Sequence, residues 1–240
     1  MEQTDRSGAE IAERIAALTA LLLRLNIEVA ARRDAATGRA HMERLRTWLS
    51  AEKVDDLLSP QERPVVHSEL GELTDEQIFS LNWRLQAAGA LVWSVGWLKA
   101  MPRYDRSMPA AMVQDYLPMF KPIQPFVRVA ERIERPVIEA ERERAEFWHW
   151  RVRTRLLELQ GMVPPAGDSF VAVVERAVAG AVSSGVIAGA REGDIDCDGV
   201  PFGKLPQAAW ADAASSIIER HYALNWLCGN EAWDEVATHT

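Results

Sequence analysis

Cysteine is scarce in this chain. Its 240 residues include two cysteines, Cys197 and Cys228. They are not spaced as a zinc-binding knuckle or as a redox pair, and two are too few for the disulfide framework of a small secreted domain. This scarcity predicts reduced thiols and a cytoplasmic protein, and it gives no sign of a bound cofactor.

The sequence also lacks a basic start and a long apolar run. The acidic residues Glu2, Asp5 and Glu10 precede the first apolar segment, which is the reverse of the basic start of a signal peptide. The richest apolar segment, residues 15–25, is shorter than the ~20 residues that span a bilayer. We therefore expect a soluble protein with no membrane partner.

Positive charge is in deficit. The chain has 27 lysines and arginines against 35 acidic side chains, which gives a formal net charge of -8. A molecule with this charge repels phosphate backbones and anionic lipid heads. Nucleic acid is therefore not expected as a partner.

Common catalytic signatures are absent as well. The sequence contains no glycine-rich phosphate-binding loop of the P-loop or dinucleotide type and no G-x-S-x-G nucleophile elbow. These absences argue against the common nucleotide-binding and hydrolase classes.

Apolar residues, by contrast, are plentiful. They make up 48% of the chain, which is enough for a core of ordinary globular size. No internal repeat or low-complexity tract is present. We expect residues 1–8 to be a disordered N-terminus and residues 9–240 to form a single helical domain, as a monomer or a homodimer.

Helix signals dominate the sequence. Over residues 9–33 the apolar side chains recur at steps of three and four, which predicts a long helix with one apolar stripe. The stripe consists of Ile11, Ile15, Leu18, Leu22, Leu25 and Val29. Thr37-Gly38 is predicted to break this helix before a second one at residues 39–49.

The helix after Thr74 is predicted to be central. Thr74 and Gln77 have capping-box spacing, and residues 85–98 are apolar nearly all round, as in a helix surrounded by others. Residues 126–160 are also helical by composition, and Pro136 should kink or split that segment. Further helices are predicted to begin at Ser59 and to lie at residues 110–116, 168–182 and 205–228.

Between residues 187 and 205 the helical pattern disappears, and glycine, aspartate and proline replace it. This segment is predicted to be an irregular loop or a small β-hairpin. The whole pattern predicts an all-α fold, a bundle of about seven to nine helices.

The last predicted helix carries the first candidate site. Spacing at 100° per residue places His221 in the middle of an apolar arc beside Asn225, so His221 should be buried. Imidazole titrates near neutral pH, so His221 could act as a general acid or base, with Glu219 or Asp234 orienting it. The alternative is a neutral core histidine whose nitrogens are satisfied by Asn225, a carbonyl or a carboxylate.

Two polar residues on the central helix are also candidates. Arg84 and Gln86 fall among apolar neighbours, where an unpartnered polar group is costly. If Arg84 is buried it needs a carboxylate, and Glu219 and Asp234 are the candidates. A buried pair of this kind can fix the alignment of two helices without having any other function. The candidate ligand-binding residues are therefore Arg84, Gln86, Asn225 and Trp226.

A second candidate site is a possible calcium loop. Asp194, Asp196 and Asp198 stand at the first, third and fifth positions of an EF-hand pattern, with Gly199 at the sixth. The second half of the pattern fails, because Leu205 replaces the glutamate that should end it. A hairpin turn at Asp198-Gly199 explains the same residues, and we expect no metal site.

The C-terminal stretch carries a distinctive set of motifs. It runs Glu219-Arg220-His221, then Ala223-Leu224-Asn225-Trp226-Leu227, then Trp233-Asp234-x-Val236 and Thr238-x-Thr240. Supporting motifs are Leu58-Ser59-Pro60-x-Glu62, Trp83-Arg84 and Trp150-x-x-Arg153. With these motifs, the chain from about residue 18 to residue 240 resembles a bacterial family known as domain of unknown function 4272.

The resemblance implies a fold and a set of recurring polar positions, but no reaction. Two residues depart from what similar proteins tend to have. Gln86 stands where an acid is common, and His239 stands where an aspartate is usual. Both departures remove negative charge.

Two functions are compatible with these features. The first is a non-catalytic cytoplasmic protein that binds a protein partner or a small ligand. The second is an enzyme of unknown reaction that uses His221 as general acid or base and Arg84 to hold an anionic substrate. The accessibility of His221 separates them, because a catalytic imidazole must reach a substrate.

Overall fold

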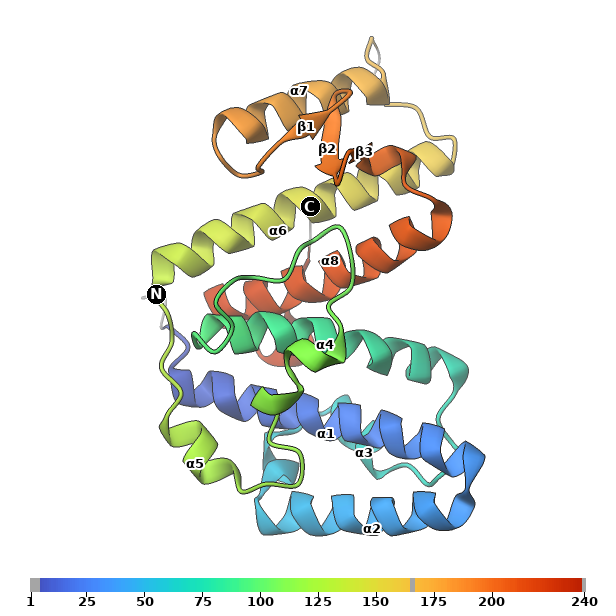
Figure 1. Ribbon diagram of the computed structural model, residues 1–240, viewed down its shortest axis with the longest axis vertical. Helices are drawn as coiled ribbons and strands as arrows, with labels where there is room; N and C mark the ends of the chain where they lie inside the picture. Colours follow the sequence, from blue (N-terminus) through green and yellow to red (C-terminus); the bar gives the residue numbers. More distant parts are fainter. Residues whose placement is uncertain (1–4, 165–166, 239–240) are drawn as a thin grey trace.

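In the part of the chain that the structure describes, six long helices are stacked side by side (Figure 1). The structure is a computed structural model that describes residues 5–164 and 167–238. The helices are α1 (Gly8–Arg33), α2 (Ala35–Ala51), α4 (Asp75–Ser94), α6 (Arg135–Leu159), α7 (Phe170–Ser183) and α8 (Gln207–Cys228). Their order in the stack is α2, α1, α4, α8, α6, α7, so α4 and α8 are neighbours although they are far apart in the sequence. The predicted all-α fold is confirmed.

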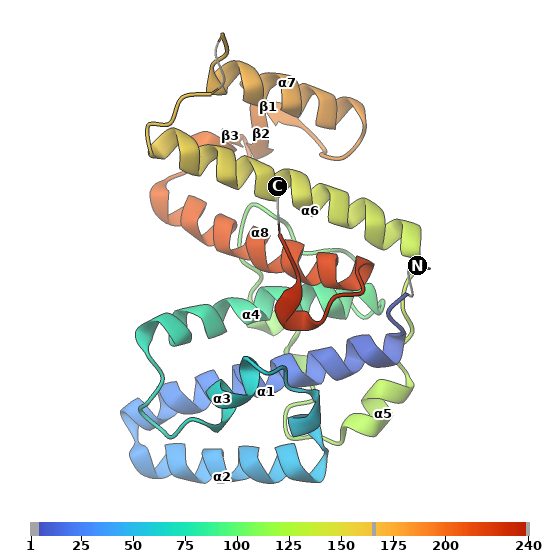
Figure 2. The ribbon, with the colours of Figure 1, turned by 180° about the vertical axis from the view of Figure 1, so that it is seen from behind.

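Shorter elements cover two faces of the stack. They are the 3-10 turns η1 (Val54–Leu57), η2 (Ala110–Met112), η3 (Gln114–Tyr116), η4 (Phe202–Lys204) and η5 (Trp233–Glu235), and the helices α3 (Glu62–His67) and α5 (Ile123–Arg128). The connection from α4 to α6 crosses the face seen in Figure 1, whereas α3 and η5 lie on the face seen from behind (Figure 2). Within the described residues, no helix combines the length and the apolar character needed to cross a bilayer.

The break between α1 and α2 lies at Asp34, so the prediction of a break at Thr37-Gly38 is wrong. The Asp34 carboxylate accepts hydrogen bonds from the N–H groups of Ala36 and Thr37 and so caps α2. Gly38 lies inside α2, where a Cβ atom would come within 2.3 Å of the Ala31 Cβ in α1. The glycine therefore permits a close approach of two helices.

Helix α1 is buried on more sides than its apolar stripe predicts, because it lies between α2 and α4. Arg24 and Glu28 are both 0% exposed and form an ion pair across one turn, with 2.8 Å between Nη1 and Oε2. Val29, which the stripe placed inside, is exposed. The segment after α3 covers the Arg24–Glu28 pair, because Arg24 also donates to Ser68 and Glu69 and the Gly71 N–H donates to Glu28.

Helix α4 is central, as predicted, with α1 on one side and α8 on the other. It begins with the predicted capping box, in which the Thr74 hydroxyl accepts from the Gln77 N–H and the Gln77 side chain accepts from the Thr74 N–H. It ends at Ser94, and Gly96 then adopts a φ of +73°, a left-handed conformation that does not continue the helix. Trp97 is therefore outside the helix.

Pro136 splits the predicted segment 126–160, as expected. Helix α5 ends at Arg128 and α6 begins at Arg135, with Pro136 in its first turn. Proline is tolerated there because the first N–H groups of a helix have no partner within it. The proline thus marks the start of α6, and the break between the two helices lies at residues 129–134.

A small antiparallel sheet lies between α7 and α8 in sequence, where the small β-hairpin was predicted. Its strands are β1 (Ala190–Arg191), β2 (Asp194–Cys197) and β3 (Val200–Pro201), in the order β1-β2-β3. Two-residue turns connect them, and both turns have positive φ: 48° and 78° at Glu192-Gly193, 51° and 86° at Asp198-Gly199. The predicted turn at Asp198-Gly199 is confirmed, and the sheet packs on α7.

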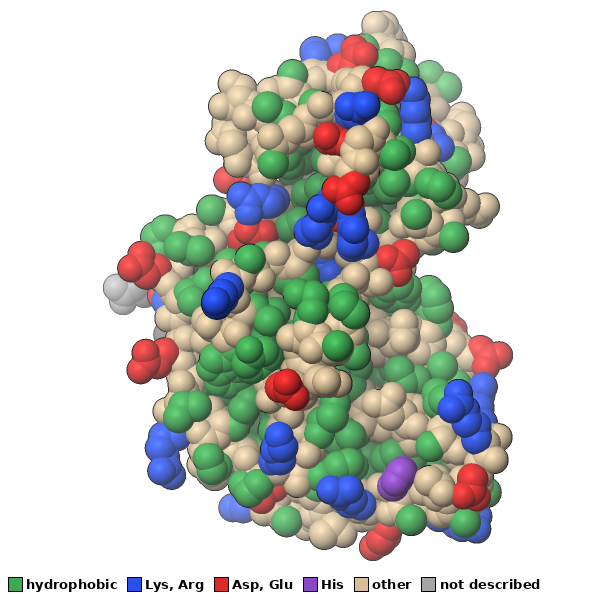
Figure 3. Space-filling model, in the orientation of Figure 1, with side chains coloured by type: hydrophobic (Ala, Val, Ile, Leu, Met, Phe, Trp, Pro, Cys, Tyr) green, Lys and Arg blue, Asp and Glu red, His purple; other side chains and the backbone are tan. Residues whose placement is uncertain are grey.

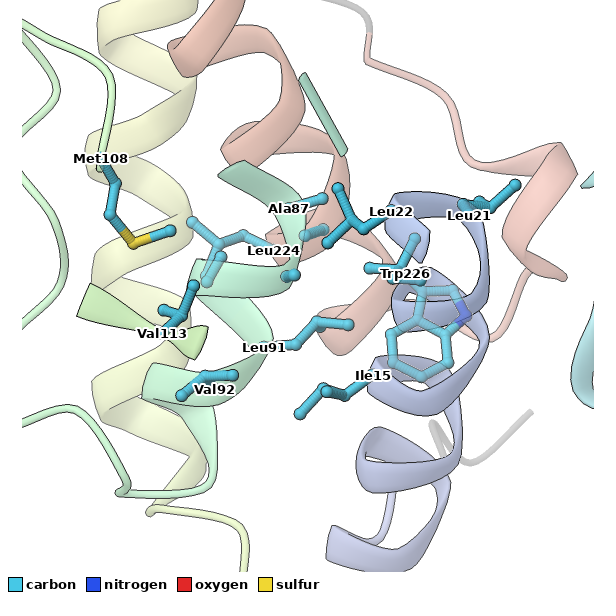
Figure 4. Close-up of a cluster of buried hydrophobic side chains, with 14 of the residues drawn as sticks. Ile15, Leu21, Leu22, Ala87, Leu91, Val92, Met108, Val113, Leu224 and Trp226 are labelled. Carbon is cyan, nitrogen blue, oxygen red and sulfur yellow. The ribbon is translucent and has the colours of Figure 1, made fainter. Parts of the chain in front are cut away.

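One continuous core runs through the middle of the stack. Figure 4 shows Leu91 of α4 between Ile15 of α1 and Leu224 of α8, and all three side chains are fully buried. Met108 of the long connection closes the core on the other side of α4. Tight packing of this kind fixes the positions of the polar residues that α4 and α8 also carry.

Residues 5–8, which were expected to belong to a disordered N-terminus, have defined contacts. Ser7 caps α1 through a capping box with Glu10, and Asp5 forms an ion pair with Arg132 at 2.5 Å. Residues 1–4 lie outside the described residues. The expectation of a single domain from residue 9 to residue 240 stays a prediction.

Charged side chains of both signs meet where the long connection approaches the sheet (Figure 3). Arg103 and Arg106 of the connection both pair with Asp198 in the β2–β3 turn, the first at 2.6 Å. Asp105 pairs with the same two arginines, and they hold the pKa of its carboxyl group at about 2 although burial opposes this.

Candidate functional site

The two faces of α8 carry different candidate residues. Helix α8 packs against α4 on one side and against α6 on the other (Figure 2). Each step along a helix turns the side chain by about 100°. Glu219 and His221 are two steps apart, so they point to nearly opposite sides of α8 and cannot face the same neighbour. Glu219 contacts α4, whereas His221 contacts α6.

His221 is buried, as predicted, and its partner is a second histidine. The Nδ1 atoms of His221 and of His149 in α6 lie 2.8 Å apart, and the two residues are 1% and 6% exposed. Burial lowers the pKa of His221 to about 3 and that of His149 to about 4. Both rings are therefore neutral at pH 7, and one Nδ1 must donate its proton to the other.

The proposed acid–base group does not form around His221. Glu219 pairs with Arg84, and Asp234 binds the segment before α3, so neither carboxylate orients the imidazole. A hydrogen bond to the Asn225 side chain opposes the lowering of the His221 pKa. The geometry matches the alternative interpretation, in which His221 is a neutral core histidine hydrogen-bonded within the protein. Its partner His149 was not predicted from the sequence.

Arg84 has the partner that the sequence proposed. Its Nη1 donates to both carboxylate oxygens of Glu219 at 3.4 and 3.2 Å, across the α4–α8 interface. Burial raises the pKa of Glu219, and the Arg84 charge opposes this. The Arg84 guanidinium also lies 5.8 Å from the centre of the Tyr222 ring. Arg84 is only partly buried, so its charge remains accessible.

Asp234 connects η5 to the segment before α3. One of its oxygens accepts from the Ser59 hydroxyl at 2.6 Å, and the other accepts from the Gln61 N–H at 3.0 Å. The sequence offered Asp234 as a carboxylate that orients His221 or pairs with Arg84. It does neither, and holds the turn that leads into α3.

A buried ion pair lies beside Asp234 and was not predicted. Nη2 of Arg14 donates to both oxygens of Glu62, at 2.8 and 2.6 Å. The Ser59 N–H donates to Glu62 at 3.0 Å, and the Arg14 guanidinium lies 4.6 Å from the Trp233 ring. Burial lowers the pKa of Arg14, and the Glu62 carboxylate opposes this. The pair joins α1, α3 and η5.

Gln86 is buried, and both its amide nitrogen and its amide oxygen are bonded to the protein. Its amide donates to the Met108 carbonyl at 3.1 Å and accepts from the Met108 N–H at 3.0 Å. It also accepts from Arg220 at 2.5 Å. Gln86 therefore fixes the long connection against α4 and α8, and it lines none of the clefts described below.

Arg220 is a buried cation that sequence reasoning missed. Besides Gln86, it donates to the backbone carbonyls of Pro102, Arg103 and Arg106. Burial lowers its pKa to about 10, so it still carries a charge at neutral pH. It lies between Glu219 and His221 on α8 and points toward the connection between α4 and α6, which the sequence did not place beside α8.

Arg84 and Asp234 line one small cleft, which we call the Arg84 cleft. Its volume is about 180 Å³. It is lined by Leu21, Gln61, Glu62, Val65, Gln77, Ser80, Leu81, Arg84, Tyr222 and Asp234. The cleft thus unites two of the predicted residues but includes neither Glu219 nor His221.

Trp226 and Asn225 lie at two other hollows. Trp226 lines a cleft of about 350 Å³ between the start of α1 and η5, where the Arg6 guanidinium lies 4.6 Å from its ring. Asn225 lines a hollow of about 860 Å³ between α6 and the C-terminal segment, and its amide donates to the Ala237 carbonyl at 2.8 Å. The four predicted ligand-binding residues therefore do not share one site.

The three aspartates of the calcium pattern have separate partners. Asp194 is buried and accepts two hydrogen bonds of 2.8 Å from Arg151, while Asp198 pairs with Arg103 and Arg106. Asp196 accepts from the Gly199 N–H at 2.7 Å. They occupy a strand and its turn, so they do not wrap around one point. Residues 5–164 and 167–238 contain no group of three or more His, Cys, Asp or Glu side chains that could hold a metal ion.

Comparison with known proteins gives one match. The family model described as "Domain of unknown function (DUF4272)" matches residues 1–179. The match ends before the C-terminal block at residues 219–240 that carried most of the resemblance, and His239 in that block lies outside the described residues. No curated protein and no solved structure matches the chain.

Proposed function

The chain belongs to the DUF4272 family, and from its geometry we propose that it is a non-catalytic protein that binds a small ligand in the Arg84 cleft. The ligand class that suits the cleft is a small zwitterion of the free amino acid type. The observation that carries the proposal is that Arg84 and Asp234, which have opposite charges, line the same cleft.

Arg84 retains hydrogen-bonding capacity for a carboxylate. Among the described residues, Glu219 is its only hydrogen-bond partner and uses Nη1 alone. A guanidinium has five N–H donors in a planar fork that suits a carboxylate. The ligand carboxylate would bind Nη2 and Nε of Arg84, with the Ser80 hydroxyl on the same wall.

Asp234 supplies the opposite charge. Each of its oxygens accepts one hydrogen bond from the protein, and a carboxylate has about four acceptor sites in all. A ligand ammonium group would use the remaining sites. Glu62 also lines the cleft, but Arg14 already neutralises it.

The size of the cleft favours a small molecule. Sites for drug-sized ligands and cofactors have volumes of about 300–1,000 Å³. The Arg84 cleft, at about 180 Å³, suits a molecule the size of an amino acid better than one the size of a nucleotide.

The alternative is an enzyme that uses His221 as general acid or base. A catalytic base must come within hydrogen-bond reach of its substrate. His221 is 1% exposed and bonded to His149, and it does not line the Arg84 cleft. These features support the non-catalytic proposal.

We also propose that the protein works in the cytoplasm. The low cysteine content of the chain supports this location. Cys197 and Cys228 are free thiols in the structure, which agrees with a reducing compartment.

Binding can be tested with three matched compounds: L-alanine carries both charges, propionate only the carboxylate, and ethylamine only the ammonium group. We expect L-alanine or another free amino acid to bind in calorimetry and to raise the melting temperature. Neither single-charge analogue should do so. Arg84→Gln should abolish this binding.

Arg32→Gln is the matched control, because Arg32 is exposed near the end of α1 and does not line the cleft. It should bind as the wild type does. If no free amino acid binds, or if Arg84→Gln binds as well as Arg32→Gln, the proposal is wrong.

A further inference from the structure

A groove between α6 and α7 is lined mainly by apolar side chains. Its volume is about 460 Å³. Phe147 and Trp150 of α6 lie on one wall, and Ala177 and Ala181 of α7 lie on the other. The two aromatic rings are 5.3 Å apart and are only partly buried. An aromatic surface left open to solvent is a common anchor for a protein partner.

The α7 wall of the groove is built from small side chains. Ala177 and Ala181 are one turn apart on the same face of α7, and Ser184 follows at the end of that wall. Small residues let another backbone approach closely. The groove therefore has the form that receives one face of a helix, with large side chains inserted between α6 and α7.

Negative charge borders the groove on the α6 side. Glu143 and Glu146 line it, and they also line the hollow on the other side of α6, together with Glu139 and Glu231. Arg135 and Arg142 pair with Glu139 and Glu146, but Glu143 is exposed and has no ion-pair partner among the described residues. The border thus carries an unpaired carboxylate, that of Glu143, beside the Arg142–Glu146 pair, in a molecule whose net charge is -8.

We infer that the α6–α7 groove binds a basic amphipathic helix of a partner protein. The apolar face of that helix would contact Phe147 and Trp150, and its lysines or arginines would lie beside Glu143 and Glu146. Charge complementarity selects this partner, because an acidic border repels an acidic helix, a nucleic acid or an anionic membrane surface. This inference does not depend on the Arg84 cleft.

The probe is a synthetic helical peptide of about 18 residues, or five turns, with leucine on one face and lysine on the other. A peptide of the same composition in scrambled order lacks the apolar face, and a leucine–glutamate peptide lacks the charge. Fluorescence anisotropy of labelled peptides gives the affinities. We expect the lysine amphipathic peptide to bind at least about tenfold more tightly than either comparator, a difference of about 1.4 kcal/mol.

Two pairs of variants locate the binding site. Ala177→Gln fills the groove, while Ala179→Gln makes the same change at an exposed position of α7. Glu143→Lys reverses the border charge, while Glu43→Lys makes the same reversal at an exposed position of α2. The groove variant and the border variant should each weaken binding at least about tenfold, and their controls less than about twofold.

Three outcomes would overturn the inference. The first is equal binding of the scrambled and amphipathic peptides, which would mean that charge alone attracts them. The second is equal binding by Ala177→Gln and Ala179→Gln. The third is a dimer in sedimentation that Ala177→Gln dissociates and Ala179→Gln does not, because a second copy of this chain would then occupy the groove.

Discussion

The Nδ1 atom of His149 lies 2.8 Å from the Nδ1 atom of His221, and each buried imidazole has the other as its hydrogen-bond partner. The contact joins α6 to α8, which pack against each other. It is possible only while at least one of the two nitrogens lacks a proton, because two N–H groups cannot bond to each other.

The free energy of unfolding should therefore fall as the pH falls from about 6.5 to about 4. Both folded-state pKa values, about 4 for His149 and about 3 for His221, lie below the ordinary value of 6.5. Between these limits the unfolded chain binds protons that the folded chain does not, so stability is complete above the unfolded pKa and is lost below it. Each histidine contributes up to about 1.4 kcal/mol per pH unit.

Urea unfolding of the wild type and of His149→Gln at several pH values measures this effect. The carboxylates titrate in both proteins. The difference between the two slopes of unfolding free energy against pH therefore gives the contribution of His149. We expect the variant to lose about 1.4 kcal/mol less per pH unit near pH 5. Parallel slopes would show that His149 is not a neutral buried group.

Removing one partner of the Arg14–Glu62 pair should be strongly destabilising. Both residues are buried and bonded at 2.6 Å, so Glu62→Gln leaves the Arg14 charge without its counter-ion. We expect a loss of about 3–5 kcal/mol in the free energy of unfolding, measured with urea. Arg14→Met with Glu62→Met in one protein should cost less, because no charge is then buried. A double substitution that costs as much as the sum of the single ones would contradict this.

Gln86→Met should destabilise the protein by about 2–3 kcal/mol, because it leaves the Met108 backbone groups and one Arg220 donor unpaired. Gln86→Glu keeps the acceptor and places a negative charge beside Arg220, although it loses the bond to the Met108 carbonyl. We expect Gln86→Glu to be the more stable of the two in thermal and urea unfolding at pH 7. If Gln86→Met were the more stable variant, the hydrogen bond from Arg220 to the side-chain oxygen of residue 86 would not stabilise the protein.

The same glycine-to-alanine change at residues 38 and 180 tests the close contact between α1 and α2. A Cβ at residue 38 would meet the Ala31 Cβ at 2.3 Å, so we expect a loss of about 1–3 kcal/mol despite the higher helix propensity of alanine. A Cβ at residue 180 has nothing within 4 Å. Gly180→Ala should therefore gain about 0.5–1 kcal/mol. Equal effects of the two substitutions on the urea midpoint would rule out the close contact of α1 and α2.

Local signals in the sequence predicted most of the helices. The capping box at Thr74 and Gln77, the proline at residue 136 and the turn at Asp198-Gly199 each act within a few residues, so the sequence alone is enough to locate them. Gly38 was misread because its function depends on Ala31 in the neighbouring helix, which is a packing contact.

The candidate site was predicted only in part. Burial of His221 and the Arg84–Glu219 pair followed from helical periodicity and from the cost of burying an unpartnered charge. His149, Arg14 and Arg220 were missed, because their burial depends on which helices become neighbours. Periodicity gives the face of a helix on which a residue lies, but it does not give the helix that covers that face.

The measurement that tests the central claim most directly is a titration of the arginine Nε–H signals of the protein by nuclear magnetic resonance with L-alanine. Arg84→Lys identifies the Arg84 signal by its loss, and Arg32 on the exposed surface serves as the internal control. Our account predicts a saturable shift of the Arg84 signal, with no change for Arg32 and no change on adding propionate or ethylamine. An Arg84 signal that stays in place through the titration with every free amino acid would contradict it.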